Sequence, residues 1–352
     1  MVVMPVDCFL GIDVGSVSTK LVLIDAEKHL LFQTYLRTHG GPIEAIQAAL
    51  RQLNEKMGDV PVRTACTTGS GRHLAAVMVG AEVVKNEITA HAVAAREVEP
   101  RVRTVIDIGG QDSKIIFLKD GVSTGFNMNS VCAAGTGSFL DHQAARLNVP
   151  IEKFGELALK SRSPVKIAGR CGVFAESDLI SKQQMGYSKE DLIAGLCLAL
   201  ARNYLAGVAR GKKILPVVLF QGGVAANAGM RAAFTSLLGI PVVVPPYYKV
   251  MGALGAALLA REHSLRSNAE GSFRGLKAIA GFRYTPRSFI CGDCANDCEI
   301  SELYIDERLA GRWGSRCGKW ADLSRPSAHK EEERENVVLR DYATVVPGAR
   351  RR

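Results

Sequence analysis

Two aspartates are the first residues whose type and spacing could do chemistry. Asp13 and Asp107 each follow an apolar run, and each precedes a glycine by two positions, Gly15 and Gly109. Backbone N–H groups at glycine turns can bind phosphate, and one or two carboxylates can hold magnesium together with its waters. These two positions therefore predict a site for a nucleotide phosphate and a magnesium ion.

The surroundings of the two aspartates form an internal repeat. Residues 8–25 and 102–120 both consist of an apolar strand, a glycine turn, a lysine (Lys20 or Lys114) and a second apolar strand. The period is too long for a solenoid, so the repeat predicts a duplicated domain. One such turn could belong to an ordinary hairpin. Two matched copies, together with a later Gly-Gly turn at residues 222–223, favour the nucleotide site.

The elements that must position these residues alternate between strands and helices, which predicts an α/β architecture. Residues 65–71 are expected to be a turn-rich loop. The chain changes in composition near residue 263, where a segment rich in Ser, Gly and Lys begins. Helices are expected over residues 42–57, 87–97, 136–147, 174–185, 189–210, 225–238 and 251–263.

Composition excludes several classes of protein. The chain has 352 residues, of which 47 % are hydrophobic, so its bulk is not intrinsically disordered. No uncharged run is apolar enough to span a membrane, and no signal peptide is recognised, so a cytoplasmic protein is expected. The net charge is +9, but no nucleic-acid-binding motif accompanies it, so no nucleic-acid partner is expected.

Several long runs of sequence resemble one known family. The chain resembles the acetate kinase/actin/Hsp70-type ATPases, and within them it is identified as a member of the 2-hydroxyacyl-CoA dehydratase activator family, which includes the ATPase subunits of benzoyl-CoA reductase. The resemblance implies a duplicated ribonuclease-H-like, two-lobed α/β ATPase, followed by a small cysteine-rich module. The runs are GIDVGSVSTK (11–20), NEITAHA (86–92), DIGGQDSK (107–114), NMNSVCAAGTGSFLD (127–141), CGVFAESDLI (171–180), FQGGVAAN (220–227) and MGALGAALLA (251–260).

The resemblance and the composition together predict five segments. The expected segments are ATPase lobe I (1–120), lobe II with the cluster cysteines and a closing helix (121–262), a linker (263–280), a cysteine-rich metal module (281–322) and a charged, flexible tail (323–352).

The resemblance also implies roles for individual residues. Asp13 and Asp107 would hold Mg²⁺ through water and, with Gln111, would serve catalysis. ATP or ADP would occupy the site between the lobes. The phosphates would lie against Gly15, Ser16, Ser18, Thr19, Lys20, Gly109, Gly110, Gln111, Lys114, Gly135, Thr136 and Gly137, and the adenosine against Gly222, Gly223 and Asn227.

Cys132 and Cys171 match the two cluster cysteines of the family. In that family a homodimer holds one bridging [4Fe–4S] cluster, with two thiolates from each subunit. The implied function is ATP-dependent reductive activation. A ferredoxin or flavodoxin would supply an electron, and a partner iron–sulfur enzyme would receive it. That partner could be a 2-hydroxyacyl-CoA dehydratase, an aryl-CoA reductase or a related double-cluster protein. The alternative is a small-molecule, sugar-type kinase of the same superfamily.

The remaining cysteines form two groups. Cys291, Cys294, Cys298 and Cys317 have a spacing typical of a metal site, and either Zn²⁺ or an iron–sulfur cluster suits four thiolates. Three further cysteines lie among apolar or small residues and are expected to be core thiols. They are Cys8, Cys66 and Cys197.

Overall fold

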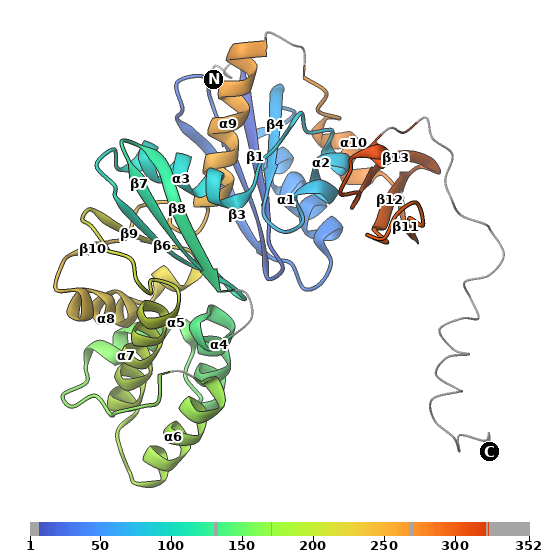
Figure 1. The fold of residues 1–352 in the computed structure, drawn as a ribbon. Coiled ribbons are helices and arrows are strands. Elements are labelled where there is room, and N and C mark those ends of the chain that lie inside the picture. Colours follow the sequence, from blue (N-terminus) through green and yellow to red (C-terminus); the bar gives the residue numbers. More distant parts are fainter. Residues whose placement is uncertain (1–6, 130–132, 170, 268–270, 322, 324–352) are drawn as a thin grey trace, which may run out of the picture. The chain divides into compact units, whose positions relative to one another are not determined.

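The computed structural model describes residues 7–129, 133–169, 171–267, 271–321 and 323. The chain divides into two compact units, Met1–Gly281 and Phe282–Arg352. The first unit contains two five-stranded sheets with helices packed on them, which confirms the predicted two-lobed α/β architecture (Figure 1).

The first sheet is built around the first copy of the repeat. Its order is β3-β2-β1-β4-β5, with β1 antiparallel to β2 and parallel to β4. All seven residues of β1 are buried, as expected for a central strand covered on both faces. The strands are β1 (Cys8–Val14), β2 (Ser18–Ile24), β3 (Leu30–Arg37), β4 (Val62–Thr68) and β5 (Val83–Val84).

The second sheet repeats this arrangement. Its order is β10-β9-β6-β7-β8, and the central strand β6 is antiparallel to its hairpin partner β7 and parallel to β9. In both hairpins the aspartate lies opposite the lysine, Asp13 opposite Lys20 and Asp107 opposite Lys114. This shared register confirms the internal repeat. The strands are β6 (Thr104–Ile108), β7 (Ser113–Lys119), β8 (Val122–Asn129), β9 (Val218–Gln221) and β10 (Val242–Val243).

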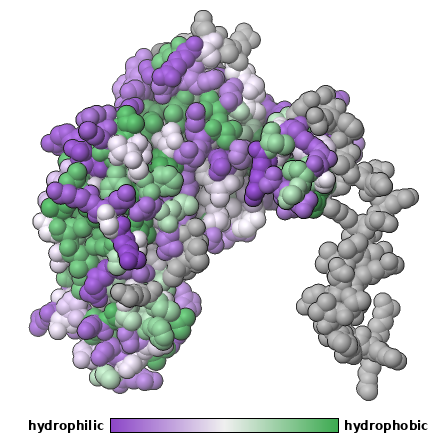
Figure 2. All heavy atoms as spheres, viewed as in Figure 1, coloured by the Kyte–Doolittle hydropathy of each residue, from purple (hydrophilic) through white to green (hydrophobic). Residues whose placement is uncertain are grey.

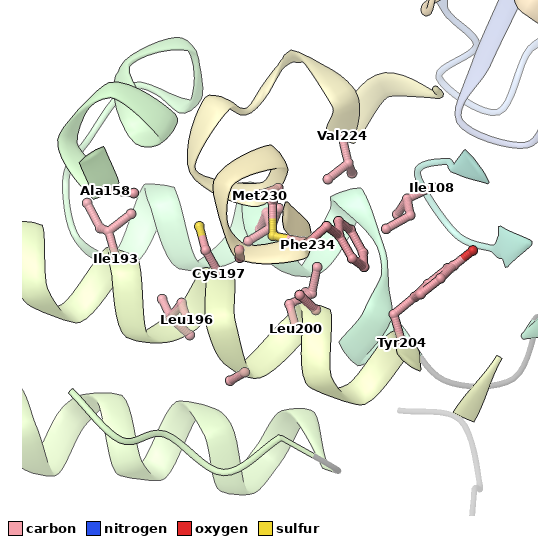
Figure 3. Close-up of a cluster of buried hydrophobic side chains, with 14 of the residues drawn as sticks. Ile108, Ala158, Ile193, Leu196, Cys197, Leu200, Tyr204, Val224, Met230 and Phe234 are labelled. Atoms are coloured by element: carbon pink, nitrogen blue, oxygen red, sulfur yellow. The ribbon is translucent and has the colours of Figure 1, made fainter. Parts of the chain in front are cut away.

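The helices of the second lobe enclose an apolar core beneath its sheet (Figure 3). Phe234 packs edge-on against Tyr204 and Phe220, with ring centroids 5.3 and 5.2 Å apart. The Tyr204 hydroxyl donates to the Lys114 carbonyl oxygen at 2.6 Å, so this core also holds the second hairpin. The helices are α4 (Gly137–Arg146), α5 (Ile151–Leu159), α6 (Gly172–Gln184), α7 (Lys189–Gly207) and α8 (Ala228–Leu238).

The lobe boundaries differ from the predicted ones. A boundary at residue 120 falls between β7 and β8, which are hydrogen-bonded neighbours in the second sheet. The closing helix α9 (Met251–Ser267) does not complete the second lobe but lies against β1 and β4 of the first (Figure 1). It is buried along most of its length, and a Cβ at Gly11 would lie 1.9 Å from the Ala253 carbonyl oxygen.

Of the other helices in this part of the chain, α1 and α2 pack on the first sheet, whereas α3 packs on α9 and on β7 and β8. Asn86 caps α3 by accepting the Thr89 N–H at 2.9 Å, and Pro42 begins α1. The segment predicted as a loop at residues 65–71 is instead mostly strand β4, which lies between β1 and β5. The helices are α1 (Pro42–Met57), α2 (Arg72–Val79) and α3 (Glu87–Val98).

The predicted linker at residues 263–280 contains regular structure. Helix α9 continues to Ser267, and α10 (Leu276–Gly281) packs on α1, where Gln47 donates to the Ile279 carbonyl oxygen at 3.1 Å. Leu276 and Ile279 are buried in this contact. The second half of the segment therefore belongs to the first lobe.

The C-terminal unit contains a small antiparallel sheet in the order β11-β12-β13. Its apolar nucleus consists of Phe289, Cys291, Ile300 and Trp320, and the Phe289 and Trp320 rings meet edge-on at 4.7 Å. The strands are β11 (Tyr284–Ile290), β12 (Glu299–Ile305) and β13 (Arg308–Trp313), followed by a 3₁₀ turn, η3 (Lys319–Ala321).

Strand β8 leaves apolar side chains on the surface of the first unit. Val122, Phe126 and Met128 are 62 %, 54 % and 44 % exposed, and Phe126 and Met128, two positions apart, share one face of this edge strand. Figure 2 shows apolar side chains at the surface over the second sheet. Among the described residues, no helix combines the length and apolar character needed to cross a membrane.

Candidate functional site

A cleft of about 900 Å³ lies between the two sheets, at the ends of both hairpins. Both halves of the repeat contribute residues to it, so the structure brings together most of the residues predicted to bind phosphate and magnesium. The predicted residues that line the cleft are Asp13, Gly15, Ser16, Ser18, Lys20, Asp107, Gly109, Gly110, Gln111, Lys114, Gly222 and Gly223.

The two hairpin turns have the same backbone hydrogen bond. The Gly15 N–H donates to the Ser18 carbonyl oxygen, and the Gly109 N–H donates to the Asp112 carbonyl oxygen, both at 3.0 Å. The residues between these pairs line the cleft, so their backbone N–H groups lie within a turn that faces it. Such turns are suited to bind phosphate oxygens.

Lys114 is the centre of a buried group of charges. Its Nζ lies 2.9 Å from Asp112 Oδ1 and 3.5 Å from both Asp107 Oδ2 and Glu87 Oε1. Burial alone would lower the pKa of Lys114, but the three carboxylates outweigh burial and raise this pKa. The lysine is therefore a fixed positive charge in the cleft, where it can balance phosphate.

Asp107 stays ionised although it is buried. Desolvation raises the pKa of its carboxyl, but His91, Lys114 and Lys20 together overcome that effect and lower it. Asp13 has a matching partner, because Lys20 Nζ lies 3.1 Å from Asp13 Oδ2. The cleft thus presents two aspartates, one from each hairpin.

The cleft also offers a donor set suited to magnesium. Asp107 Oδ1 is buried and has no hydrogen-bond partner among the described residues. A buried carboxylate oxygen without a donor calls for a cation or an ordered water. Magnesium prefers carboxylate oxygens and keeps several waters, so Asp13 and Asp107 are chemically suitable ligands.

His91 and Gln221 were not assigned a role from the sequence. Gln221 Nε2 donates to His91 Nδ1 at 2.6 Å, so the ring presents Nε2 toward the cleft. That nitrogen lies 3.8 Å from Asp107 Oδ2. The pair therefore lies beside the Asp107 carboxylate. His91 belongs to the run NEITAHA, which was recognised only as part of the family resemblance.

Glu87 is a second residue without a role predicted from the sequence. It occupies the first turn of α3 and lines the cleft opposite the hairpins. Burial raises the pKa of its carboxyl, Lys114 partly opposes that shift, and Asp112 adds to it. A carboxylate with a raised pKa in a phosphate site is a candidate to accept a proton or to orient water. The sequence feature that could have identified Glu87 is its position immediately after Asn86, which caps α3.

A second cavity, of about 470 Å³, adjoins the cleft. The two share Tyr35, Lys249 and Gly223 among their lining residues. The predicted residues Gly137 and Asn227 lie in this second cavity. Its position beside the phosphate turns suits the base and ribose of a nucleotide.

Three predicted phosphate residues do not line either cavity. Thr19 is buried, and its hydroxyl lies 3.1 Å from the Thr38 hydroxyl, which in turn donates to the Gly15 carbonyl oxygen at 3.1 Å. Thr19 therefore supports the first turn from behind. Gly135 and Thr136 precede α4 and are also absent from both linings.

The second hairpin is bonded directly to the start of α4. The Gly137 N–H donates to the Gly109 carbonyl oxygen and the Ser138 N–H to the Gly110 carbonyl oxygen, both at 2.9 Å. Any movement of this phosphate turn therefore acts on the N-terminus of α4. Cys132 lies five positions before that helix begins.

Of the two predicted cluster cysteines, Cys132 lies outside the described residues. Cys171 occupies the N-cap position of α6 and is partly exposed. A Cβ at Gly172 would lie 3.3 Å from Ala134 Cβ, so the segment after Cys132 contacts the segment after Cys171. Thiolates at helix N-termini are stabilised by the helix dipole, which makes Cys171 suitable as a cluster ligand.

The three cysteines predicted as core thiols are buried. Burial raises the pKa of Cys8 to about 11, and those of Cys66 and Cys197 to about 12. A thiol that resists ionisation is a poor metal ligand. The prediction for these three residues is confirmed.

Comparisons with known proteins agree with the fold and the cleft. The sequence model of the BadF/BadG/BcrA/BcrD ATPase family matches residues 10–260. The (R)-2-hydroxyglutaryl-CoA dehydratase activating ATPase of Acidaminococcus fermentans is 39 % identical over 254 residues, which cover 71 % of this chain and 96 % of that protein. The activator of lactoyl-CoA dehydratase of Anaerotignum propionicum is 38 % identical over 257 residues, covering 72 % and 97 %.

One solved structure extends the similarity to three dimensions. The activator of 2-hydroxyisocaproyl-CoA dehydratase from Clostridium difficile, with bound ADPNP, is 32 % identical and superimposes with a TM-score of 0.70. The match covers 74 % of this chain and 97 % of that one. The family match ends at residue 260, so the C-terminal unit lies beyond it.

Proposed function

Because the chain belongs to the BadF/BadG/BcrA/BcrD ATPase family, we propose that it is an ATP-dependent activator that drives a low-potential electron into a partner enzyme. The observation that carries the proposal is the direct bonding of a phosphate turn, at Gly109 and Gly110, to the start of α4. A nucleotide-dependent change at the turn would then reach the segment that contains Cys132.

ATP binding uses the cleft and the adjoining cavity. The two hairpin turns surround the phosphates, and Lys20 and Lys114 balance their charge. The adenosine lies in the second cavity, near Gly223 and Asn227. Asn227 Oδ1 accepts the Met230 N–H at 3.0 Å, so this side chain also caps α8.

Hydrolysis depends on the carboxylates of the cleft. Asp13 and Asp107 would hold magnesium, which supplies charge neutralisation on the phosphates when bound. Gln221 holds the His91 ring beside Asp107. Glu87 is the carboxylate assigned to orient the attacking water, since it lines the cleft next to Lys114 and belongs to α3 rather than to a hairpin turn.

Electron transfer requires a redox group near the nucleotide-linked segments. Cys132 and Cys171 would each supply a thiolate, and a symmetric homodimer would complete a set of four. A [4Fe–4S] cluster in that position would supply one-electron chemistry at low potential. The N-termini of α4 and α6 follow the two cysteines, so a shift of α4 changes the environment of the bound group.

The relatives indicate the class of partner. Their names describe activation of 2-hydroxyacyl-CoA dehydratases, and one is a subunit of benzoyl-CoA reductase. We infer that this chain acts in the cytoplasm on an iron–sulfur enzyme of that kind, with a ferredoxin or flavodoxin as electron donor. The residues of the nucleotide cleft do not determine which enzyme accepts the electron.

The proposal can be tested with anaerobically purified protein. ATP hydrolysis, dimer mass and the electron paramagnetic resonance of the dithionite-reduced protein are measured for the wild type and for Asp107→Asn. We expect the wild type to be a dimer with a cluster signal that changes on ATP addition. Asp107→Asn should keep the cluster and lose hydrolysis. A colourless protein that phosphorylates sugars would instead support the kinase alternative.

A further inference from the structure

The four cysteines of the C-terminal unit meet at one end of its sheet. The loop of residues 291–298, which carries three of them, joins β11 to β12. Strand β13 runs antiparallel to β12 and ends at Trp313, opposite Ser301 near the start of β12. The segment after β13, with Cys317, therefore returns to the same end as the loop.

Two side-chain contacts join that segment to the loop. Arg316 Nη1 donates to Asn296 Oδ1 at 3.1 Å, and Lys319 forms an ion pair with Asp293. These contacts lie on both sides of Cys317 in sequence. The loop and the segment after β13 are thus packed together around the cysteines.

Two of the cysteines are part of the rigid hairpin. The Cys291 N–H donates to the Cys298 carbonyl oxygen at 2.8 Å, which closes the base of the loop. Cys291 is 8 % exposed and packs in the apolar nucleus, and Cys298 is packed against it. These two thiols are fixed by the sheet rather than by the loop.

The other two cysteines are exposed and have donors beside their sulfurs. Asn296 Nδ2 donates to Cys294 Sγ at 3.6 Å, and Ser315 Oγ lies 3.5 Å from Cys317 Sγ. Metal-bound thiolates are commonly stabilised by such outer hydrogen bonds. Among the described residues, no three of the four sulfurs lie within 4.8 Å of one another. Ligation therefore requires the sulfurs to come closer together than they are here.

The small apolar nucleus of the unit favours a bound metal. Within the described part of the unit, this nucleus consists of Phe289, Cys291, Ile300 and Trp320. Small domains with little apolar core usually need a disulfide, a metal or a partner to fold. Among the described residues, Cys291, Cys294 and Cys298 form no disulfide.

We propose that Cys291, Cys294, Cys298 and Cys317 bind one structural Zn²⁺ ion in a tetrahedral thiolate site. A single ion needs less space than an iron–sulfur cubane, and the loop and the segment after β13 are already in direct contact. The site is separate from the nucleotide cleft, so the proposal does not depend on the proposed ATPase function.

The test compares metal content in the full-length chain. Zinc, iron and acid-labile sulfide are measured in the wild type, Cys294→Ser and Cys317→Ser. We expect about one zinc per wild-type chain and at least a tenfold loss in each serine variant, with iron and sulfide unchanged. Thr285→Ala, at the opposite end of β11, is the matched control and should keep its zinc. Cys294→His should also keep it, because imidazole binds zinc.

A second measurement guards against misfolded variants. The wild-type protein exchanged with Co²⁺ should show the intense visible absorption of tetrahedral thiolate coordination. Absence of zinc from the wild type, or zinc that survives in both serine variants, would overturn the proposal. Loss of iron and sulfide in Cys294→Ser would show that these cysteines bind an iron–sulfur cluster instead of zinc. A disulfide formed by Cys294 in the purified protein would show that they bind no metal.

Discussion

Gly69 and Gly222 occupy equivalent positions in the two lobes. Each follows the strand parallel to the first hairpin strand, and each has φ of +86°. A Cβ at Gly69 would lie 2.5 Å from Asp13 Oδ1, and one at Gly222 would lie 2.9 Å from Asp107 Oδ1. The duplication therefore includes a third strand, and each aspartate is approached closely by the backbone of its own lobe.

We predict that Gly222→Ala impairs nucleotide binding. The new Cβ would lie 2.4 Å from the Ile108 carbonyl oxygen, and the positive φ adds strain of about 1–3 kcal/mol. Because the Asp107 carboxylate must move, we expect at least a tenfold weaker ATP affinity in calorimetry. Gly239→Ala is the control, since Gly239 has φ of +66° but no atom within 4 Å of its Cβ position. Equal ATP affinity in both variants would contradict the claim that a side chain at residue 222 displaces the Asp107 carboxylate.

The hairpins could be predicted from the sequence because their information is local. An apolar run, a short polar turn and a second apolar run determine both the pairing and its register. Asp13 and Asp107 were therefore identified as equivalent residues. The structure confirms their registers with Lys20 and Lys114 and brings both carboxylates into one cleft.

Other features depend on tertiary contacts and carry no local signal. The Thr- and Gly-rich residues 65–71 look like a loop, but β4 is stabilised by strands on both sides, and Thr67 Oγ1 donates to the Arg72 carbonyl oxygen at 2.8 Å. The apolar helix α9 could cover either sheet. Glu87 gained a possible role only from its distance to Lys114, which is 27 positions away in sequence.

We predict that Glu87→Gln removes the acid limb of the pH–rate profile, in which the rate of ATP hydrolysis falls as the pH is lowered. If the Glu87 carboxylate orients water, activity requires its ionised form and rises with pH through its pKa. Burial raises that pKa above 4.5, so the wild-type limb should lie at higher pH than for an exposed glutamate. The variant should hydrolyse ATP roughly 10²–10⁴-fold more slowly, with a flat profile in that range. Steady-state rates at fixed ionic strength provide the measurement, and an unchanged limb would exclude Glu87.

We predict that Gly252→Ala disturbs the first aspartate. A Cβ at Gly252 would lie 2.6 Å from Asp13 Oδ2 and 3.3 Å from His91 Cε1. Alanine favours a helix by up to about 1 kcal/mol over glycine, so helix propensity alone would stabilise this variant. Gly207→Ala, in α7 with open space around it, isolates that helix effect. We expect weaker magnesium-dependent ATP binding only in Gly252→Ala, and comparable binding in both variants would contradict the contact.

We predict that Cys132→Ala and Cys171→Ala each abolish the iron–sulfur chromophore. Both variants should retain ATP affinity, because Cys171 lines neither the cleft nor the adjoining cavity and Cys132 is not among the residues predicted to contact the nucleotide. Anaerobic absorption spectra and nucleotide titrations give the two readouts. Cys294→Ser is the control and should keep the chromophore while losing zinc. A full cluster in Cys132→Ala would disprove the ligand assignment.

The bond between the second phosphate turn and α4 gives the sharpest test of coupling. Ser138→Pro removes the N–H that donates to the Gly110 carbonyl oxygen, and proline is tolerated in the first turn of a helix. Ser138→Ala keeps that N–H and serves as the control. One lost hydrogen bond should lower stability by only about 0.5–1.5 kcal/mol, so the variant should fold and bind ATP.

The coupling itself is read from the cluster. In the wild type and in Ser138→Ala, ATP should change the rate at which a chelator removes iron, because the turn acts on α4 and on the segment with Cys132. In Ser138→Pro the chelation rate should respond at least several-fold less to ATP. If ATP changes the rate equally in all three proteins, the signal does not pass through the Gly110–Ser138 bond, and another route between the cleft and the cysteines must carry it.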